Sequence, residues 1–286
     1  MASELNWKEM DAFIDQAIAE DLGKGDVTTD GLIPPDTLIE AEWVAKEAAC
    51  IAGLPVAERI FKKFDPAVIC YWMVEDGMRV MPGKFGLIRG KAQAILKAER
   101  LALNLIQRLS GIATLTSAFV TKVQSYDVKI YDTRKTTPLM RSLEKYAVRA
   151  GGGYNHRFGL YDMILIKDNH REILDDLGLT DWTALIKTMR EKNPELEVEM
   201  EVTGAYQVEE AVKAGVNYIL LDNMLPEQIS EIIKQWQGKV QFEASGGIHL
   251  DNVEAYARTG VDRISIGALT HSAKAVDISL EILSIK

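Results

Sequence analysis

The chain has 286 residues, of which 47% are hydrophobic and 26% charged, the composition of a globular protein that can bury a sizeable core. Its net charge of −9 and pI near 5.1 argue against non-specific binding to nucleic acid, whose partners are usually basic. No apolar run approaches the roughly 20 residues needed to cross a membrane, and the polar, acidic start resembles no targeting peptide. Two cysteines are too few for a disulfide framework, so we expect a reducing, cytoplasmic location.

The first part of the chain, to about residue 111, mixes helical and strand signals. Apolar residues recur at helical spacing over residues 4–22. Strand-like runs broken by turns follow over residues 39–53 and 68–96. A strongly apolar helix is then predicted over residues 98–109.

Beyond residue 111, short β-rich runs alternate with helical stretches. The runs are VKIYDT, MILIKDN, LEVEMEV, YILLDN, VQFEASG and RISIGAL. This alternation predicts βαβ units and a parallel sheet, and near-continuous apolar character is typical of strands buried on both faces. Six strands instead of eight predict an incomplete βα-barrel. An open doubly wound sheet is the alternative.

Several of these runs end in polar or small residues. In a βα-barrel the carboxyl ends of the strands point to one face, and that face carries the active site. The residues concerned are Asp132, Thr133, Arg134, Lys167, Asp168, Glu201, Asp222, Ser245, Gly246, Gly247, Gly267 and Ala268. We therefore look for function among these strand ends.

A cluster of positive charge lies between residues 129 and 171. This segment holds nine lysines and arginines against four acids, a balance of +5. Because the protein is acidic overall, we expect the cluster to bind a small anion, with arginine as a planar fork and lysine as a point charge. The cations at strand ends or in the loop between strands are Arg134, Lys135, Arg157 and Lys167.

Other residues of this segment have plainer interpretations. Arg141, Lys145 and Arg149 recur at spacings of four on a predicted helix, which favours a solvated helix face. His156 is a candidate hydrogen-bond donor, whereas His170 is predicted to be a helix cap or a surface residue.

Two acids, Glu201 and Asp222, follow buried apolar residues. A carboxylate there is costly unless it is paired or emerges into a polar site, where it could hold ribose hydroxyls, a metal or a developing cation. The alternation of Glu197, Glu199 and Glu201 leaves open that all three face outward along one side of a strand.

Glycines stand where the last two strands turn into helices, at Gly246, Gly247 and Gly267. They would let backbone N–H groups approach a phosphate, although a plain tight turn is also compatible with the pattern. The sequence contains no spacing typical of a zinc site and no motif for a covalent nucleophile. Cations facing two acids and a phosphate-type turn predict a doubly anionic substrate and a phosphorylated partner.

Seven motifs, in this order, resemble the quinolinate phosphoribosyltransferase family of NAD biosynthesis: DTRKTTP, LEKYAV, GGGYNHR, LIKDNH, ILLDN, EASGGI and GALTHS. The run AERLALNLIQRLSGIAT resembles the helix that precedes the family's barrel. The resemblance implies an α/β fold with an N-terminal α/β open-sandwich domain over residues 1–111. It further implies an incomplete, six-stranded TIM-like βα-barrel over residues 112–270, with residues 271–286 packing back on the N-terminal domain.

The resemblance also implies an activity. Quinolinate and 5-phosphoribosyl-1-pyrophosphate would react in the presence of Mg²⁺ to give nicotinate mononucleotide, pyrophosphate and CO₂. The protein would be a cytoplasmic homodimer, or a higher oligomer of dimers, with shared active sites and neither nucleic acid nor membrane as a partner. The alternatives are a related phosphoribosyltransferase or molybdenum-linked paralogue with another acceptor, and a non-catalytic ligand-binding regulator built on a barrel.

Residue roles follow from the same resemblance. Quinolinate would be held by Thr133, Arg134, Lys135, His156, Arg157 and Lys167, and by Arg100 of the partner subunit. Glu201 and Asp222 would hold the ribose hydroxyls and sit near Mg²⁺, and with Lys135 and Lys167 they are the predicted catalytic residues. The 5-phosphate would be surrounded by Ser245, Gly246, Gly247, Gly267, Ala268 and His271. The sequence departs from the family pattern at Leu139, where a glycine is usual, and at Leu101 and Thr203.

Overall fold

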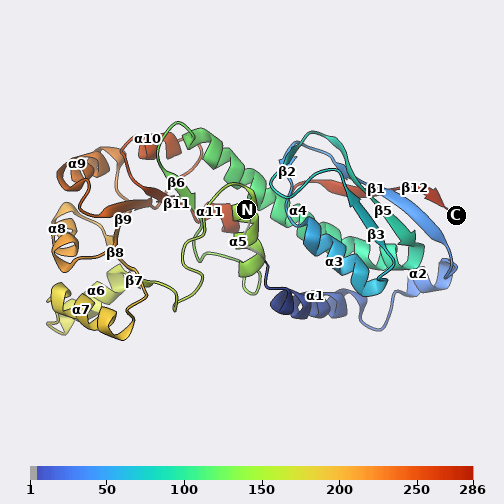
Figure 1. Cartoon of the computed structure of the whole chain (residues 1–286), viewed down its shortest axis with the longest axis horizontal. Coiled ribbons are helices and arrows are strands. Elements are labelled where there is room, and N and C mark those ends of the chain that lie inside the picture. Colours follow the sequence, from blue (N-terminus) through green and yellow to red (C-terminus); the bar gives the residue numbers. More distant parts are fainter. Residues whose placement is uncertain (1–4, 286) are drawn as a thin grey trace. The chain divides into compact units, whose positions relative to one another are not determined.

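The computed structural model describes residues 5–285, which divide into two compact units (Figure 1). Unit 1 contains the chain up to Ser117, residues 136–152 and the chain from Leu269 onward. Unit 2 contains residues 118–135 and 153–268. The division falls inside helix α4 (Ala92–Val123), which continues unbroken through Gly111, where the sequence pattern changes.

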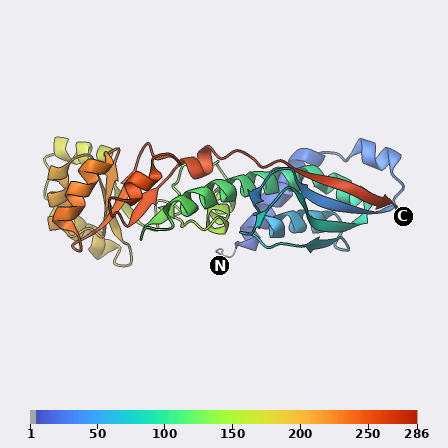
Figure 2. The ribbon, with the colours of Figure 1, turned by 90° about the horizontal axis from the view of Figure 1, so that it is seen from above.

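Unit 1 is built around an antiparallel four-stranded sheet with the order β12-β1-β5-β3. Its elements are α1 (Trp7–Leu22), α2 (Val27–Leu32), β1 (Leu38–Ala45), β2 (Ala49–Cys50), α3 (Leu54–Phe64), β3 (Ile69–Trp72), β4 (Arg79–Val80), β5 (Gly83–Lys91), most of α4, α5 (Arg141–Ala150), α11 (Ala268–His271), which begins at the division, and β12 (Ile278–Ile285). The C-terminal strand β12 runs antiparallel beside β1 (Figure 2).

The core of unit 1 is aromatic. Strand β1 buries every second residue, and Trp43 on its inner face is fully buried. The Trp43 ring meets Phe61 of α3 edge-on at 5.8 Å between ring centroids, and Trp72 and Phe85 complete the cluster. Such edge-to-face pairs stabilise beyond the area they bury.

Three sequence-based expectations for unit 1 are wrong. The strand-like run over residues 68–96 ends at Lys91, because the alanine-rich stretch after it starts α4, and alanine is the best helix former. The helix predicted over residues 98–109 is therefore only the middle of a 32-residue helix. The solvated face expected on α5 is wrong for Lys145, whose exposed fraction is 3%.

Unit 2 is a six-stranded parallel sheet with the order β6-β11-β10-β9-β8-β7. Its elements are β6 (Lys129–Tyr131), β7 (Ile164–Ile166), α6 (Asp168–Asp176), α7 (Trp182–Lys192), β8 (Val198–Val202), α8 (Ala205–Ala214), β9 (Tyr218–Asp222), α9 (Pro226–Trp236), β10 (Gln241–Ser245), α10 (Val253–Ala257) and β11 (Arg263–Ser265). All six predicted strands form.

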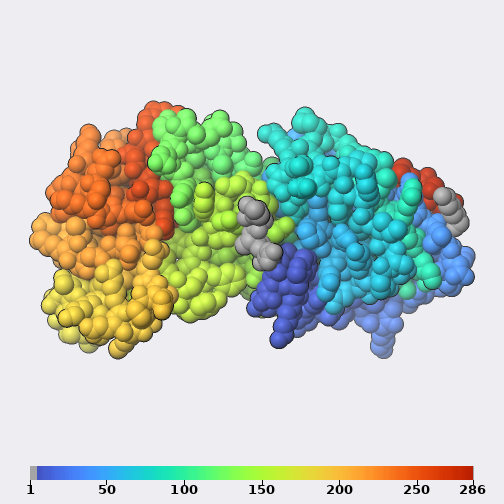
Figure 3. Space-filling view, viewed as in Figure 1, coloured from blue at the N-terminus to red at the C-terminus, as the bar shows by residue number. Residues whose placement is uncertain are grey.

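The strand order is that of a barrel. Strands β7 to β11 are neighbours in sequence order, and the last strand pairs with the first, β6. Within the described part of the chain only the β6–β7 pair of a complete ring is not formed, so the barrel is incomplete, as predicted. A doubly wound sheet would instead reverse its strand order at a switch point. Helices α6 to α9 form the outer surface of this unit, yellow and orange in Figure 3.

No helix among residues 5–285 is both long and apolar enough to span a bilayer.

Candidate active site

A cavity of about 450 Å³ opens at the carboxyl ends of the unit 2 strands. It collects most of the predicted site residues: Thr133, Arg134, Lys135, His156, Arg157, Lys167, Glu201, Asp222, Ser245, Gly246 and Gly247. It is also lined by Asp168, a strand-end residue to which no role was given, and by residues that the sequence analysis did not assign to the site: Leu165, Leu220, Asn223, Glu243 and Ser265. The convergence follows from parallel pairing, because Ser245 of β10 is in register with Asp222 on one side and with Ser265 on the other.

One wall of the cavity is cationic, and buried hydrogen bonds shape it. Asp132, at the end of β6, is fully buried and accepts the backbone N–H of His156 at 2.8 Å and the side-chain amide of Asn155 at 2.6 Å. Thr133 accepts the backbone N–H of Lys135 through its hydroxyl, at 3.1 Å. The loop after β6 is thereby tied to the segment that carries His156.

The two arginines of this wall lie close enough to repel each other. Burial lowers the pKa of Arg157, and the charge of Arg134 lowers it further, while Glu199 partly compensates. The guanidinium of Arg157 donates to the carbonyl of Met163 at 3.3 Å. Two guanidinium groups this close together favour a bound anion, because an anion offsets the repulsion between them.

The opposite wall is acidic. Lys167 Nζ lies 3.8 Å from Glu201 Oε2. Burial raises the pKa of Glu201, Lys167 lowers it, and Asp222 raises it again. The alternative in which Glu201 faces outward is wrong, since its exposed fraction is only 8% and it lines the cavity.

Asn223 fixes the geometry around Asp222. Its side-chain amide donates to Asp222 Oδ2 at 2.6 Å, and its backbone N–H donates to the Ser245 carbonyl at 2.9 Å. Asn223 adopts a left-handed φ of 55°, a conformation that asparagine tolerates better than most residues. No sequence motif indicated this role.

Of the two glycines after β10, only one is sterically confined. Gly246 has φ +92°, and a Cβ atom there would lie 2.2 Å from Asn223 Oδ1 and 2.9 Å from its backbone nitrogen. Gly247 has φ +63° but faces open space. The turn therefore leaves backbone exposed to the cavity at a point where a side chain cannot be placed.

His170 is a helix cap, one of the two roles predicted for it. It follows Lys167 at the start of α6, and its Nδ1 accepts the backbone N–H of Lys167 at 2.9 Å. The position of the Lys167 backbone thus depends on a histidine that does not line the cavity.

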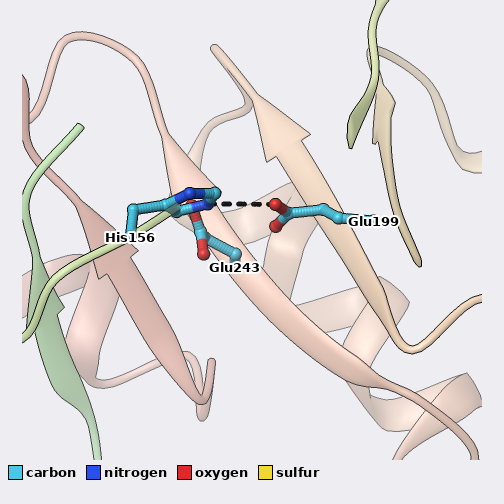
Figure 4. A group of neighbouring side chains, drawn as sticks. All are labelled: His156, Glu199 and Glu243. Atoms are coloured by element: carbon cyan, nitrogen blue, oxygen red, sulfur yellow. Dashed lines mark ion pairs between the residues drawn. The ribbon is translucent and has the colours of Figure 1, made fainter. Parts of the chain in front are cut away.

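A buried cluster lies at the floor of the cavity, formed by His156, Glu199 and Glu243. His156 Nε2 is 3.0 Å from Glu199 Oε2 and 3.4 Å from Glu243 Oε1, and the ring points at both carboxylates in Figure 4. Both glutamates are fully buried. Their ligand atoms and His156 Nε2 lie within 4.8 Å of one another, a spacing that would also suit a metal ion.

Sequence analysis missed both glutamates. The alternation of acids in LEVEMEV correctly placed Glu199 and Glu201 on one side of β8, but that side is the barrel interior, and only Glu197 is exposed. Glu243 stands two residues before Ser245, and the same period of two could have indicated that it faces the cavity.

Four predicted site residues do not line this cavity: Arg100, Gly267, Ala268 and His271. Arg100 is exposed on α4, in unit 1. Gly267 and Ala268 follow β11, and α11 begins at Ala268. His271 is exposed and its Nδ1 lies 2.6 Å from the Ser272 hydroxyl. Their predicted roles stay predictions.

An incomplete βα-barrel with paired cations, paired carboxylates and a glycine turn at its strand ends defines a class of protein, the barrel-type phosphoribosyltransferases. Comparison with known proteins narrows the class. The family description "Quinolinate phosphoribosyl transferase, C-terminal domain" matches residues 112–281, and the corresponding N-terminal domain matches residues 26–110. The chain belongs to the quinolinate phosphoribosyltransferase family.

Individual relatives agree with the family match. The chain is 40% identical to the probable nicotinate-nucleotide pyrophosphorylase [carboxylating] of Bacillus subtilis, over 97% of this chain and 95% of that protein. It is 40% identical to quinolinate phosphoribosyltransferase [decarboxylating] 1b of Nicotiana tabacum, over 96% of this chain and 82% of that protein. The solved structure of NadC from Streptococcus pyogenes superimposes with a TM-score of 0.92 at 38% identity, covering 99% of both chains.

Proposed function

We propose that this protein transfers the phosphoribosyl group of 5-phosphoribosyl-1-pyrophosphate to quinolinate, with decarboxylation. The products are nicotinate mononucleotide, pyrophosphate and CO₂. The observation that carries the proposal is the joint placement of Arg134 and Arg157 with Glu201 and Asp222 around one cavity of about 450 Å³. Such a cavity lies in the range of small-molecule sites.

The cationic wall suits the acceptor. Quinolinate carries two neighbouring carboxylates, and two arginines with Lys135 and Lys167 match that charge better than they match a monocarboxylate. Holding the ring nitrogen at attack distance from the sugar can contribute about 7–11 kcal/mol in favourable cases. Thr133 stabilises the loop that presents Lys135.

The acidic wall suits the ribose. Departure of pyrophosphate builds positive charge at the anomeric carbon, comparable to that in glycoside hydrolysis. Glu201 and Asp222 would bind the ribose hydroxyls and stabilise this charge, and preorganised carboxylates do so without reorganisation. The hydrogen bond from Asn223 supplies the preorganisation of Asp222.

The turn after β10 suits the 5-phosphate. Gly246 and Gly247 leave backbone exposed at the cavity, and Ser245 adds a hydroxyl beside them. We propose that Gly267, Ala268 and His271, which follow the neighbouring strand β11, complete this subsite.

Mg²⁺ fits the acidic wall. Glu201 and Asp222 are the hard oxygen donors that Mg²⁺ combines with phosphate oxygens, and a cation near them would offset the repulsion between their charges. Bound Mg²⁺ would neutralise charge on the pyrophosphate. Lys135 and Lys167 would supply the protein's own positive charge toward the same group.

The bond changes balance without a covalent enzyme intermediate. The ring nitrogen of quinolinate forms a bond to the anomeric carbon as the bond to pyrophosphate breaks. The bond to the carboxylate next to nitrogen then breaks, and CO₂ leaves while the quaternised ring accepts the electron pair. A proton taken up at that ring carbon completes the nicotinate product.

We further propose that the protein acts as a cytoplasmic homodimer with shared sites. The exposed position of Arg100 on α4 supports the shared sites, because an exposed arginine is available to reach a second copy of the chain.

The decisive assay is release of labelled CO₂ from quinolinate carrying the label in the carboxylate next to nitrogen, together with pyrophosphate release. Both should depend on 5-phosphoribosyl-1-pyrophosphate. Turnover of nicotinate without turnover of quinolinate would overturn the acceptor assignment and leave the transferase class. Unchanged properties in Glu201→Ala and Asp222→Ala would instead favour a non-catalytic binding protein.

A further inference from the structure

The cluster of His156, Glu199 and Glu243 is not explained by substrate contact alone. The carboxylate oxygens of both glutamates are hidden from solvent, although Glu243 is one of the residues that line the cavity. Buried carboxylates are costly unless they are partnered. Their shared partner is His156 Nε2, whose side chain is only 7% exposed.

Both ring nitrogens of His156 are engaged within the protein. Nε2 faces the two carboxylates, and Nδ1 accepts the backbone N–H of Arg157 at 2.8 Å. Burial of the ring lowers the pKa of His156, but the two carboxylates raise it by more, so the net shift is upward. The backbone N–H of Arg157 points at Nδ1 and opposes a proton on that nitrogen. A charged ring would carry a proton on Nδ1 and could not accept the Arg157 amide, so this hydrogen bond requires the neutral ring with its proton on Nε2, directed at Glu199 and Glu243.

The ring therefore anchors the chain at the point where Arg157 enters the site. On one side of this point, Asp132 holds the backbone N–H of His156. On the other, His156 Nδ1 holds the backbone N–H of Arg157. Both contacts fix the backbone from which the Arg157 guanidinium extends, and a rigid supporting shell is what keeps a binding group in its productive geometry.

We propose that Glu199 and Glu243 are positioning residues, and that with His156 they aim Arg157 at a carboxylate of the acceptor without touching the acceptor themselves. On this proposal His156 acts through Arg157 and does not donate a hydrogen bond to the acceptor. The inference rests on the proposed function for the identity of the acceptor, and it extends the site by two acids on strands β8 and β10.

The first test observes the wild-type ring directly. The chain has only four histidines, so imidazole nitrogen NMR can resolve each, and loss of one signal set in His156→Gln identifies His156. We expect a protonated Nε2 and an acceptor Nδ1, with Nε2 still hydrogen-bonded to carboxylate after quinolinate is added. A switch of either nitrogen to the added quinolinate would overturn the proposal.

The second test removes the acceptors by matched substitutions. Glu243→Leu and Glu199→Leu keep approximate volume but remove the acceptor, whereas Glu243→Gln and Glu199→Gln retain one. We expect the leucine variants to raise the KM for quinolinate on the order of 10- to 100-fold, with the KM for the phosphoribosyl donor within about twofold. The glutamine variants should recover most of the loss.

The control is Glu197→Gln, which changes a carboxylate that bonds the Tyr218 hydroxyl outside the cluster and should leave both KM values unchanged. If the leucine variants raised both KM values equally, or raised neither, the proposal would be overturned. If a leucine variant does not fold, the glutamine variants and the NMR measurement test the proposal in its place. Binding of one equivalent of Zn²⁺ by wild type but not by Glu243→Gln would also overturn it, by making the cluster a metal site. If wild type shows no quinolinate-dependent turnover, the proposed function has failed instead.

Discussion

The turn at Gly246 and Gly247 offers a test in which two neighbouring glycines share a positive φ but differ in steric confinement. Both adopt positive φ, but only Gly246 is confined, with Asn223 Oδ1 2.2 Å from the position of a Cβ atom. We therefore compare Gly246→Ala with Gly247→Ala. The second variant measures backbone strain alone, and the first measures strain together with a steric clash.

The expected magnitudes follow from these two contributions. A left-handed backbone destabilises an L-residue by about 1–2 kcal/mol. Replacing glycine by alanine also stabilises the protein by about 0.4–1 kcal/mol, because alanine lowers the conformational entropy of the unfolded chain. Gly247→Ala should thus lower the free energy of unfolding by about 0–1.6 kcal/mol. Displacing Asn223 adds about 1–3 kcal/mol of overpacking, so Gly246→Ala should cost about 1–5 kcal/mol. At about 2–4 °C per kcal/mol, the melting temperatures should differ by several degrees.

The steric clash in Gly246→Ala should also change the kinetics of the proposed reaction. Asn223 holds Asp222 by the 2.6 Å hydrogen bond, so its displacement should raise the KM for the phosphoribosyl donor and lower kcat in Gly246→Ala. Steady-state pyrophosphate release and thermal unfolding measure both effects. If Gly246→Ala matched Gly247→Ala in melting temperature and in donor KM, the steric reasoning would be refuted.

Three further predictions concern the proposed chemistry, the assembly and a strained residue. Glu201→Gln and Asp222→Asn should each lower kcat on the order of 10²–10³-fold while quinolinate still binds in calorimetry, because preorganised charge acts chiefly in the transition state. Arg100→Ala and Arg134→Ala should each be inactive alone, but an equal mixture after subunit exchange should recover about a quarter of wild-type activity, since half the dimers then hold one intact site; no recovery would exclude shared sites. Leu139 has a φ of 66° and is exposed, so Leu139→Gly should leave the melting temperature within about 2 °C or raise it, and a clear decrease would contradict strain there.

The strands of unit 2 were predictable because each is a short apolar run with a polar end. Their order was narrowed to a barrel or a doubly wound sheet but not decided, because pairing of β11 with β6 joins residues far apart in sequence and leaves no local trace. Helix α4 was predicted too short for a related reason. Residues 92–97 continue the apolar character of the strand before them, and the periodicity there does not separate strand from helix.

The strand-end part of the site was also predictable, since Glu201 and Asp222 each interrupt an apolar run. The interior part was predictable only in part, because the period of two gives the direction of these side chains but not their partner. Glu199 and Glu243 are acids inside strands, and a sequence shows the cost of burying them but not the partner that offsets it. That partner, His156, belongs to a different segment, and only the folded barrel brings the three together.

The interior acids also bear on why the cationic wall is stable before any anion binds. Arg134 lowers the pKa of Arg157, and Glu199 is among the charges that raise it again. Burial and the neighbouring Glu243 raise the pKa of Glu199 to about 7, and His156 and Arg263 oppose that rise; the Arg263 guanidinium stacks 3.5 Å from the centroid of the Tyr218 ring. Charges of alternating sign therefore extend from Arg263 through the buried glutamates to the arginines of the cavity. A substrate with two carboxylates would continue this alternation, so we infer that the barrel interior stabilises a cationic site that two arginines alone would not maintain.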